Sequence, residues 1–309
     1  MNKYIVCLWQ ATAKRYAFII DRRNSVMRKQ FMIGMAVLAL FSSCSSPLIP
    51  DEENEEDSDG NLIIKVSCLE RTPLSAPTHT DTEDVCTRLN FAVYDRDGIR
   101  VKQINQTLNE TNFGTASFQL AEGDYKLVVV AHSSNGNPTM TNPAKIQFTN
   151  AKGFTDTFLF CDDIIIADEP LKLDLVLNRI VALCRVVITD AYPKEVAKMQ
   201  FVYKGGSGAF NASTGLGCVN STQTVTFGVT PSQKPFDLYT FLHNTEGIIH
   251  LKASALDASD NVLFERSFEV SLQQCKDTWL SGPYFSGDGN GKMSIYTNTE
   301  WLSECPLAF

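Results

Sequence analysis

The sequence predicts an all-β protein. Hydrophobic residues recur with a period of two over short segments, which is typical of β-strands with one buried face. Gly and Asp-containing turns separate these segments roughly every ten residues, a spacing that favours β-sandwiches. No segment of a dozen residues in the body of the chain combines a helical period with capping residues, so we expect no long helix there.

Two segments in the first half of the chain show the period of two. Apolar and polar residues alternate over 88–93 and again over 124–129. The turn Asp95-Arg96-Asp97-Gly98 follows the first segment and Gly123 precedes the second, and Gly accommodates the positive φ that tight turns require. We therefore expect half-buried strands and a first sandwich over residues 61–168.

A second set of strands begins at 171–177, where Leu occupies every other position. The alternation stops at Asn178-Arg179, and residues 180–188 are nearly all apolar, broken only by Arg185. Such a change of phase indicates a bulge, or a strand that moves from one sheet to another. Either fits the entrance to a second sandwich, which we place at residues 169–309.

Further strands are expected in the second half because their residues are β-branched, aromatic or alternating. The last two are expected to form a hairpin across the turn at 257–261. In order, these strands are 199–203, 223–229, 236–242, 248–256 and 262–270.

The N-terminal residues 1–43 read as a secretory signal region. Arg28 and Lys29 precede the apolar run 31–41, and Ser42-Ser43 supplies a small-residue cleavage site. This apolar run is shorter than the roughly 20 residues that cross a bilayer, so it predicts a signal rather than an anchor. Met27 is the more natural start of the protein.

Cys44 is the expected lipidation site. The stretch Leu40-Phe41-Ser42-Ser43-Cys44 resembles a bacterial lipobox, with Phe41 where Leu is commonest, and this resemblance implies diacylglycerol on the Cys44 thiol. The alternative is an ordinary signal peptide that contains a Cys. Residues 44–60 would form a solvated tether, in which seven of the nine residues from Asp51 to Asp59 are acidic.

The charge of the chain bears on its partners. The net charge is −8, and residues 1–43 hold seven basic side chains against one acid, so the processed protein is more negative still. Binding to nucleic acid needs a basic surface that displaces counterions from phosphates. We therefore expect no nucleic-acid partner, and a membrane attachment that depends on lipid rather than on basic residues.

The nine cysteines show no zinc-site pattern, because no C-x-x-C pair occurs, and we expect no metal. An exported protein can form disulfides. The first pairs to test are Cys68 with Cys86 and Cys275 with Cys305. Cys184 lies in an apolar segment and is expected to be a small buried hydrophobic residue.

No catalytic or cofactor motif is found. The four histidines are scattered, residues 205–209 lack the final Gly of a nucleophile elbow, and Gly215-Leu216-Gly217 lacks the rest of a dinucleotide-binding fingerprint. Asp95 to Gly98 lacks the later ligands of a calcium loop and is interpreted as a turn. The sequence therefore predicts a protein that is not an enzyme and has no cofactor.

Aromatic residues are concentrated near the C-terminus. They either pack at the edge of a sandwich or form a contact surface for a partner subunit or a glycan, because aromatic side chains supply large contact areas. These residues are Trp279, Tyr284, Phe285, Trp301 and Phe309.

Several stretches of the sequence together resemble the FimB-type fimbrial anchor family, the anchor lipoproteins of Bacteroides-type (type V) pili. They are the lipoprotein-like start, the strand ending in Asp-x-Asp-Gly, the stretch 120–127 (LAEGDYKL) and the stretch 177–182 (LNRIVA). The resemblance extends over approximately residues 61–285.

This resemblance implies two tandem transthyretin-like β-sandwiches and a lipid anchor in the outer membrane, exposed at the cell surface. It implies an anchor or accessory subunit of a fimbrium that binds stalk subunits by β-strand complementation. A surface lipoprotein that binds glycans, also built from β-sandwiches, is the alternative.

Overall fold

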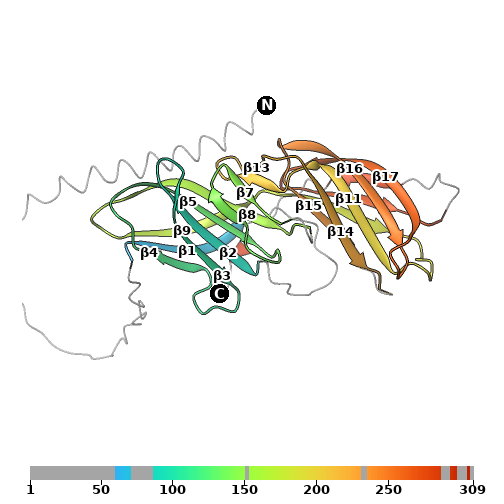
Figure 1. Ribbon diagram of the computed structural model, residues 1–309, viewed down its shortest axis with the longest axis horizontal. Coiled ribbons are helices and arrows are strands. Elements are labelled where there is room, and N and C mark those ends of the chain that lie inside the picture. The colour runs from blue at the N-terminus through green and yellow to red at the C-terminus, as the bar shows by residue number, and fades with distance from the viewer. Residues whose placement is uncertain are drawn as a thin grey trace, which may run out of the picture. The chain divides into compact units, whose positions relative to one another are not determined.

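The computed structural model describes residues 60–70, 86–149, 153–230, 235–286, 293–297 and 305–306. All secondary-structure elements in this part of the chain are β-strands, which confirms the predicted all-β fold (Figure 1). The signal region 1–43 and the tether, except Gly60, lie outside the described residues. Among the described residues, no helix is long and apolar enough to cross a membrane. The described residues all belong to one compact unit.

The first sandwich consists of one eight-stranded sheet that folds around a core. Its order is β20-β1-β9-β8-β5-β2-β3, and β4 also pairs with β1. β1 and β9 are parallel, whereas the other neighbouring pairs are antiparallel. The strands are β1 (Leu62–Glu70), β2 (Arg88–Tyr94), β3 (Arg100–Thr107), β4 (Thr115–Phe118), β5 (Gly123–His132), β8 (Thr157–Ile166), β9 (Leu171–Arg179) and β20 (Cys305–Pro306).

The expectation of half-buried strands is wrong for β2 and for the second half of β5, which are buried on both faces. Leu89, Phe91 and Val93 of β2 face the core of the first sandwich. Ala92 and Tyr94, on the other face of β2, belong to a second cluster that a small sheet covers. Alternation of apolar and polar residues in the sequence does not reveal this second covering layer, because Phe210 and Phe241, which belong to the same cluster, lie far along the chain.

The small sheet has the order β13-β12-β7-β6. It joins β6 (Thr139–Asn142) and β7 (Lys145–Gln147) to β12 (Ala209–Asn211) and β13 (Leu216–Gly217). Strands β7 and β12 pair antiparallel through Phe210 with Ile146 and Ala209 with Gln147. Residues from both halves of the chain therefore share one sheet.

The second sandwich consists of two four-stranded sheets, β15-β10-β18-β19 and β14-β11-β16-β17. Alternate apolar residues from both sheets enclose a separate core that includes Phe201, Leu251 and Leu280. The strands are β10 (Ala182–Ile188), β11 (Lys198–Gly206), β14 (Ser221–Gly228), β15 (Phe236–Thr240), β16 (Glu246–Leu256), β17 (Val262–Gln273), β18 (Asp277–Gly282) and β19 (Ser294–Thr297).

Two local turn predictions agree with the structure. The predicted hairpin at 257–261 is confirmed, since β16 pairs antiparallel with β17 and the N–H of Asp257 donates to Asn261 O at 3.0 Å. The predicted turn after β2 is also confirmed: Gly98 has φ +75°, and its N–H donates to Asp95 O at 3.0 Å.

The change of phase at residue 178 corresponds to a change of sheet rather than to a bulge. β9 ends at Arg179 in the first sheet, and β10 begins at Ala182 in the first sheet of the second sandwich. β9 itself pairs with β1 and β8, so the chain leaves the first sheet after residue 179. The division at 168/169 falls between two strands of that sheet, and the assignment of domains stays a prediction.

Candidate functional site: the junction between the two sandwiches

The chain first passes from the first sandwich to the second through a connector of two residues, Ile180 and Val181. They lie between the end of β9 and the start of β10, and both are buried. Flexible domain linkers are exposed and make few contacts. This connector is instead part of an apolar cluster that includes side chains from both halves of the chain. We call these two residues and the groups that bind them the junction.

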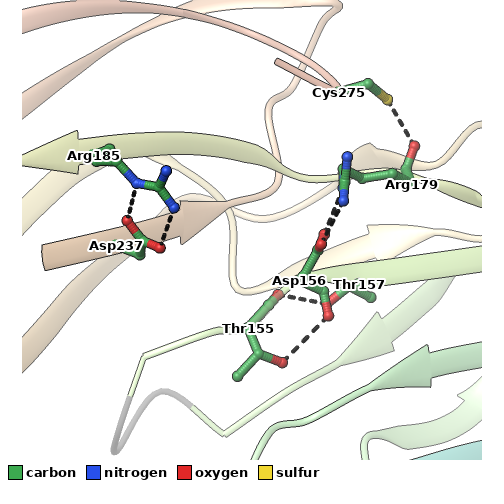
Figure 2. Close-up of polar contacts among 7 residues, drawn as sticks. All are labelled: Thr155, Asp156, Thr157, Arg179, Arg185, Asp237 and Cys275. Carbon is green, nitrogen blue, oxygen red and sulfur yellow. Dashed lines mark hydrogen bonds and ion pairs between the residues drawn. The ribbon is translucent and has the colours of Figure 1, made fainter. Parts of the chain in front are cut away.

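The turn between β17 and β18 satisfies the carbonyl groups of the junction. The Cys275 thiol donates to Arg179 O at 2.7 Å (Figure 2). Gln274 Nε2 donates to Ile180 O at 3.1 Å, and the N–H of Cys275 donates to Val181 O at 2.9 Å. Cys275 adopts φ +62°, a left-handed conformation that is uncommon outside glycine. Because buried carbonyls need donors, this turn holds the connector in one path.

Two arginine–aspartate pairs flank the connector (Figure 2). Arg179 donates two hydrogen bonds to Asp156, at 2.7 and 2.6 Å, and Arg185 donates two to Asp237, at 2.7 and 2.8 Å. The Arg179 and Arg185 side chains are only 4% and 7% exposed. Bidentate pairs of this kind fix geometry as well as charge. One pair joins β9 to the segment before β8, and the other joins β10 to β15.

The arginines also lie on aromatic rings. The guanidinium carbon of Arg179 is 5.1 Å from the centre of the Phe158 ring, and that of Arg185 is 5.4 Å from the centre of the Trp279 ring. Burial alone would lower the pKa of Arg185, but the hydrogen bond and negative charge of Asp237 outweigh it and raise the pKa. The Arg185 side chain therefore stays charged inside the fold.

The roles of these arginines were not predicted, although the sequence contains a signal. Arg179 and Arg185 stand at the edge of and inside an apolar run, and a buried charge requires a paired group. The signal predicts that each arginine has an acidic partner. It does not identify the partner, because Asp156 and Asp237 come from distant segments.

An aromatic cluster lies beside the junction. The ring of Phe241 is centred 4.9 Å from Phe210, 5.4 Å from Phe154 and 5.8 Å from Phe148. Phe148 and Phe154 precede β8, whereas Phe210 and Phe241 come from the second half of the chain. The two halves thus share an apolar core as well as a sheet.

His132 lies at one side of this cluster in a buried polar network. Its ring is 4.9 Å from that of Phe148, edge to face. The N–H of Ser134 donates to His132 Nδ1 at 3.0 Å, which assigns the proton to Nε2, 2.8 Å from Asn90 Oδ1. Burial, together with the nearby charge of Arg88, lowers the pKa of His132 to about 3.

The depressed pKa of His132 predicts acid destabilisation. The unfolded chain binds a proton at this histidine below pH 6.5, but the folded chain does not until about pH 3. Stability is therefore full above pH 6.5 and falls as the pH decreases through this window, by about 2 kcal/mol between pH 7 and pH 5. Urea unfolding at both pH values measures this loss. His132→Gln should remove this part of the pH dependence, whereas the control His250→Gln, at an exposed histidine, should retain it.

Of the five predicted site cysteines, the structure describes the side chains of two, Cys86 and Cys275. Cys44 lies outside the described residues, and so do the side chains of Cys68 and Cys305. The backbone register of β1 and β20 sets Cys305 opposite the residue that follows Cys68. Cys86 is buried in the core of the first sandwich, and Cys275 lies in the junction. The two disulfide pairings stay predictions.

Cys184 and the C-terminal aromatics lie mainly in packed positions. Burial raises the pKa of Cys184 to about 12, and its side chain belongs to the second core, as predicted. Tyr284 is buried, and its hydroxyl donates to the carbonyl of residue 253 at 2.7 Å. Phe285 packs against the same core, and Trp279 lies against Arg185. Trp301 and Phe309 lie outside the described residues.

Within the described ranges, no group of three or more His, Cys, Asp and Glu side chains is placed to hold a metal ion. Packing and polar contacts characterise the junction. Its arrangement is suited to holding two sandwiches together.

Comparisons with known proteins give one family match and several distant structural similarities. The model of a family described as "Family of unknown function (DUF6562)" matches residues 56–304. No curated protein matches the chain.

Three of the similar solved structures are fimbrial proteins. The fimbrial anchor protein Mfa2 from Porphyromonas gingivalis is 11% identical, with a TM-score of 0.41, over 78% of this chain and 97% of that chain. The tip fimbrial protein Mfa3 from the same organism is 12% identical, with a TM-score of 0.39, over 78% and 99%. A fimbrial assembly protein from Parabacteroides distasonis is 13% identical, with a TM-score of 0.36, over 80% and 98%.

Proposed function

The chain belongs to the family of unknown function DUF6562, and we propose that it is a cell-surface subunit of a fimbrium or related adhesive assembly. The observation that carries this proposal is the outer edge of β1. β4 pairs with it only at Leu62–Lys65, and the two-residue strand β20 pairs with it only at Cys68 and Leu69. A sheet edge covered by such short pieces is suited to exchange one of them for a strand of another subunit.

The two edges of the first sheet differ in a way that favours β1. Alternate residues of β1, including Ile64 and Val66, are buried in the core of the first sandwich. The opposite edge, β3, begins with the exposed basic residues Arg100 and Lys102. Charged side chains on an edge strand oppose the addition of further strands. Stalk or accessory subunits are therefore expected to bind along β1.

Attachment to the outer membrane would come from Cys44. Acyl chains on its thiol would anchor the processed protein, since each buried methylene contributes about 0.8 kcal/mol. The acidic tether that follows would hold the sandwiches away from the membrane surface. In this position the protein would act as an anchor or accessory subunit, with the junction transmitting load from one sandwich to the other.

Site-specific photo-crosslinking tests the binding edge. A crosslinker at the exposed Lys65 of β1 is expected to capture a fimbrial subunit in cells that assemble fibres, because a strand that replaces β4 would lie beside it. The matched control is the exposed Lys102 of β3, at the other edge of the same sheet. Equal capture from both positions, or none from Lys65, would contradict binding at β1.

A deletion strain tests the role in the assembly, and Cys44→Ala tests the anchor. We expect the protein to copurify with fimbrial subunits and its deletion to release fibres into the medium. Normal fibre retention and length in the deletion strain would contradict the proposal.

Labelling with a fatty-acid probe should be lost in Cys44→Ala; unchanged labelling would refute lipidation at this residue.

A further inference from the structure

β17 forms an edge of the second sandwich that is distinct from the β1 edge. It is the last strand in the sheet β14-β11-β16-β17, and β16 is its only strand partner within the described part of the chain (Figure 1). Thr278 of β18 contacts the end of β17 through Ser271 O, at 3.4 Å. The stretch Val262–Glu269 extends beyond that contact, and we call it the β17 edge.

The β17 edge begins with three consecutive exposed apolar residues. Val262, Leu263 and Phe264 are 56%, 38% and 39% exposed. Phe264 packs its ring 5.3 Å from that of Phe285, at the border of the second core. Runs of exposed apolar residues on an edge strand promote pairing with another chain. The first three residues of this edge therefore include no charged residue or proline that would oppose the addition of a strand.

The charges of the β17 edge are acidic on its solvent face. Glu265 and Glu269 stand four residues apart on that face, where β16 supplies basic neighbours. Lys252 Nζ lies 3.2 Å from Glu265 Oε2, and His250 Nδ1 lies 3.3 Å from Glu269 Oε1. Both glutamates are solvent-exposed, so they are also accessible to a strand added from the opposite side.

β16 indicates which strands this edge accepts. On the core side, Ile249 and Leu251 of β16 stand opposite Val270 and Phe268 of β17. On the solvent side, β16 carries its basic residues, and His250 stands directly opposite Glu269. A strand that alternates apolar with basic residues therefore matches Phe264 and Phe268 on the core side and the glutamates on the solvent side. Arg266 stands between the two aromatic residues on the core side, where it donates to Pro283 O at 2.9 Å.

A second copy of the chain does not meet this requirement. If two β17 edges paired antiparallel about Ser267, Glu265 of each copy would stand opposite Glu269 of the other. A parallel pair in register would place identical glutamates side by side. Like charges on neighbouring strands destabilise pairing in both cases. An anionic membrane surface is disfavoured as well, because Asp257 and Asp260 adjoin the edge and the chain carries a net charge of −8.

We propose that the β17 edge binds an extended segment of a partner protein in which apolar residues alternate with Lys, Arg or His. The segment would add a fifth strand beside β17, with its apolar residues next to Phe264 and Phe268 and its basic residues next to Glu265 and Glu269. This surface lies on a different sheet from the β1 edge. Either proposal can therefore fail while the other holds.

A peptide with the sequence of residues 248–255 of β16, IIHLKASA, is a suitable probe, added to the full-length protein. Hydrogen exchange read by mass spectrometry is expected to slow by about tenfold at alternate amides of 262–269 when the peptide is saturating. A peptide carrying H250E and K252E should bind about tenfold more weakly at low salt, because its charges repel Glu265 and Glu269. A third peptide, N-methylated at alternate backbone positions, should not bind, because strand addition needs those N–H groups.

Variants of the protein test whether the peptide binds specifically to the β17 edge or adheres to the protein in general. Glu265→Gln/Glu269→Gln is expected to remove the preference for the basic peptide over the acidic one while leaving residual binding. Ile165→Ser, which removes an exposed apolar residue in the first sandwich, is the matched control for Phe264→Ser, and only the latter should weaken binding.

Three results would overturn the proposal. One is equal binding of the basic and acidic peptides, or of the N-methylated peptide. Another is protection of 262–269 that rises with protein concentration in the absence of peptide, which would identify a second copy as the occupant. The third is protection of the same amides by phosphatidylcholine vesicles, which would identify a lipid surface.

Discussion

Asp156→Asn is expected to lower the free energy of unfolding by about 3 kcal/mol, because removal of one partner leaves a buried charge without its counter-charge. The Arg179 side chain is 4% exposed and donates two hydrogen bonds to Asp156. An asparagine offers one neutral oxygen in place of two charged ones. Urea unfolding of the full chain at pH 7 measures the difference.

A double-mutant cycle measures how much of this loss of stability comes from the pairing of Arg179 with Asp156. Arg179→Met in the Asp156→Asn background should restore more than half of the lost stability, because an apolar side chain of similar volume does not need a counter-charge. The control is Asp163→Asn, which breaks the exposed pair of Lys126 with Asp163 and should change stability by about 1 kcal/mol or less. Equal effects at the buried and exposed pairs would contradict this account of the junction.

Phe241→Ala is expected to lower the free energy of unfolding by about 3–5 kcal/mol, as is typical for truncation of a buried phenylalanine. Phe241 is fully buried, and three phenylalanine rings surround it. The cavity would open in the core that both halves of the chain share. The substitution should therefore also increase cleavage by a protease within the small sheet, which limited proteolysis can map.

The matched control for this truncation is Ile165→Ala, at the most exposed large hydrophobic residue of the described chain. Its effect should be within about 0.5 kcal/mol, since no packed contact is lost. If Phe241→Ala had a similarly small effect, the aromatic cluster would not couple the two halves.

Both predictions concern how firmly the junction holds the two sandwiches together. Under the proposed function, the subunit must carry load between its sandwiches, and the connector is short, buried and hydrogen-bonded. Weakening the junction should thus impair fibre retention without affecting labelling at Cys44. Under the proposed function, this separates transmission of load from anchoring.

Several elements were predictable because their signals are local. The strands at 199–203 and 248–256, and the hairpin at 257–261, follow from alternation and turn residues over short windows. The turn at Asp95–Gly98 follows from side-chain acceptors and a glycine within four residues. The site was less predictable, because Arg179 and Asp156 are brought together only when β8 pairs with β9.

By itself, the sequence determined that the protein is all-β, where most strands of the second sandwich lie, and that the pattern of apolar residues changes phase near residue 178. These features depend on residue periodicity and turn chemistry, which act between near neighbours. Only the tertiary structure decided that β9 pairs parallel with β1, that β2 is covered on both faces, and that Asp156 and Asp237 neutralise the two arginines. Those features depend on contacts between residues far apart in the chain, which are formed when the sheets pack and water is excluded from between them.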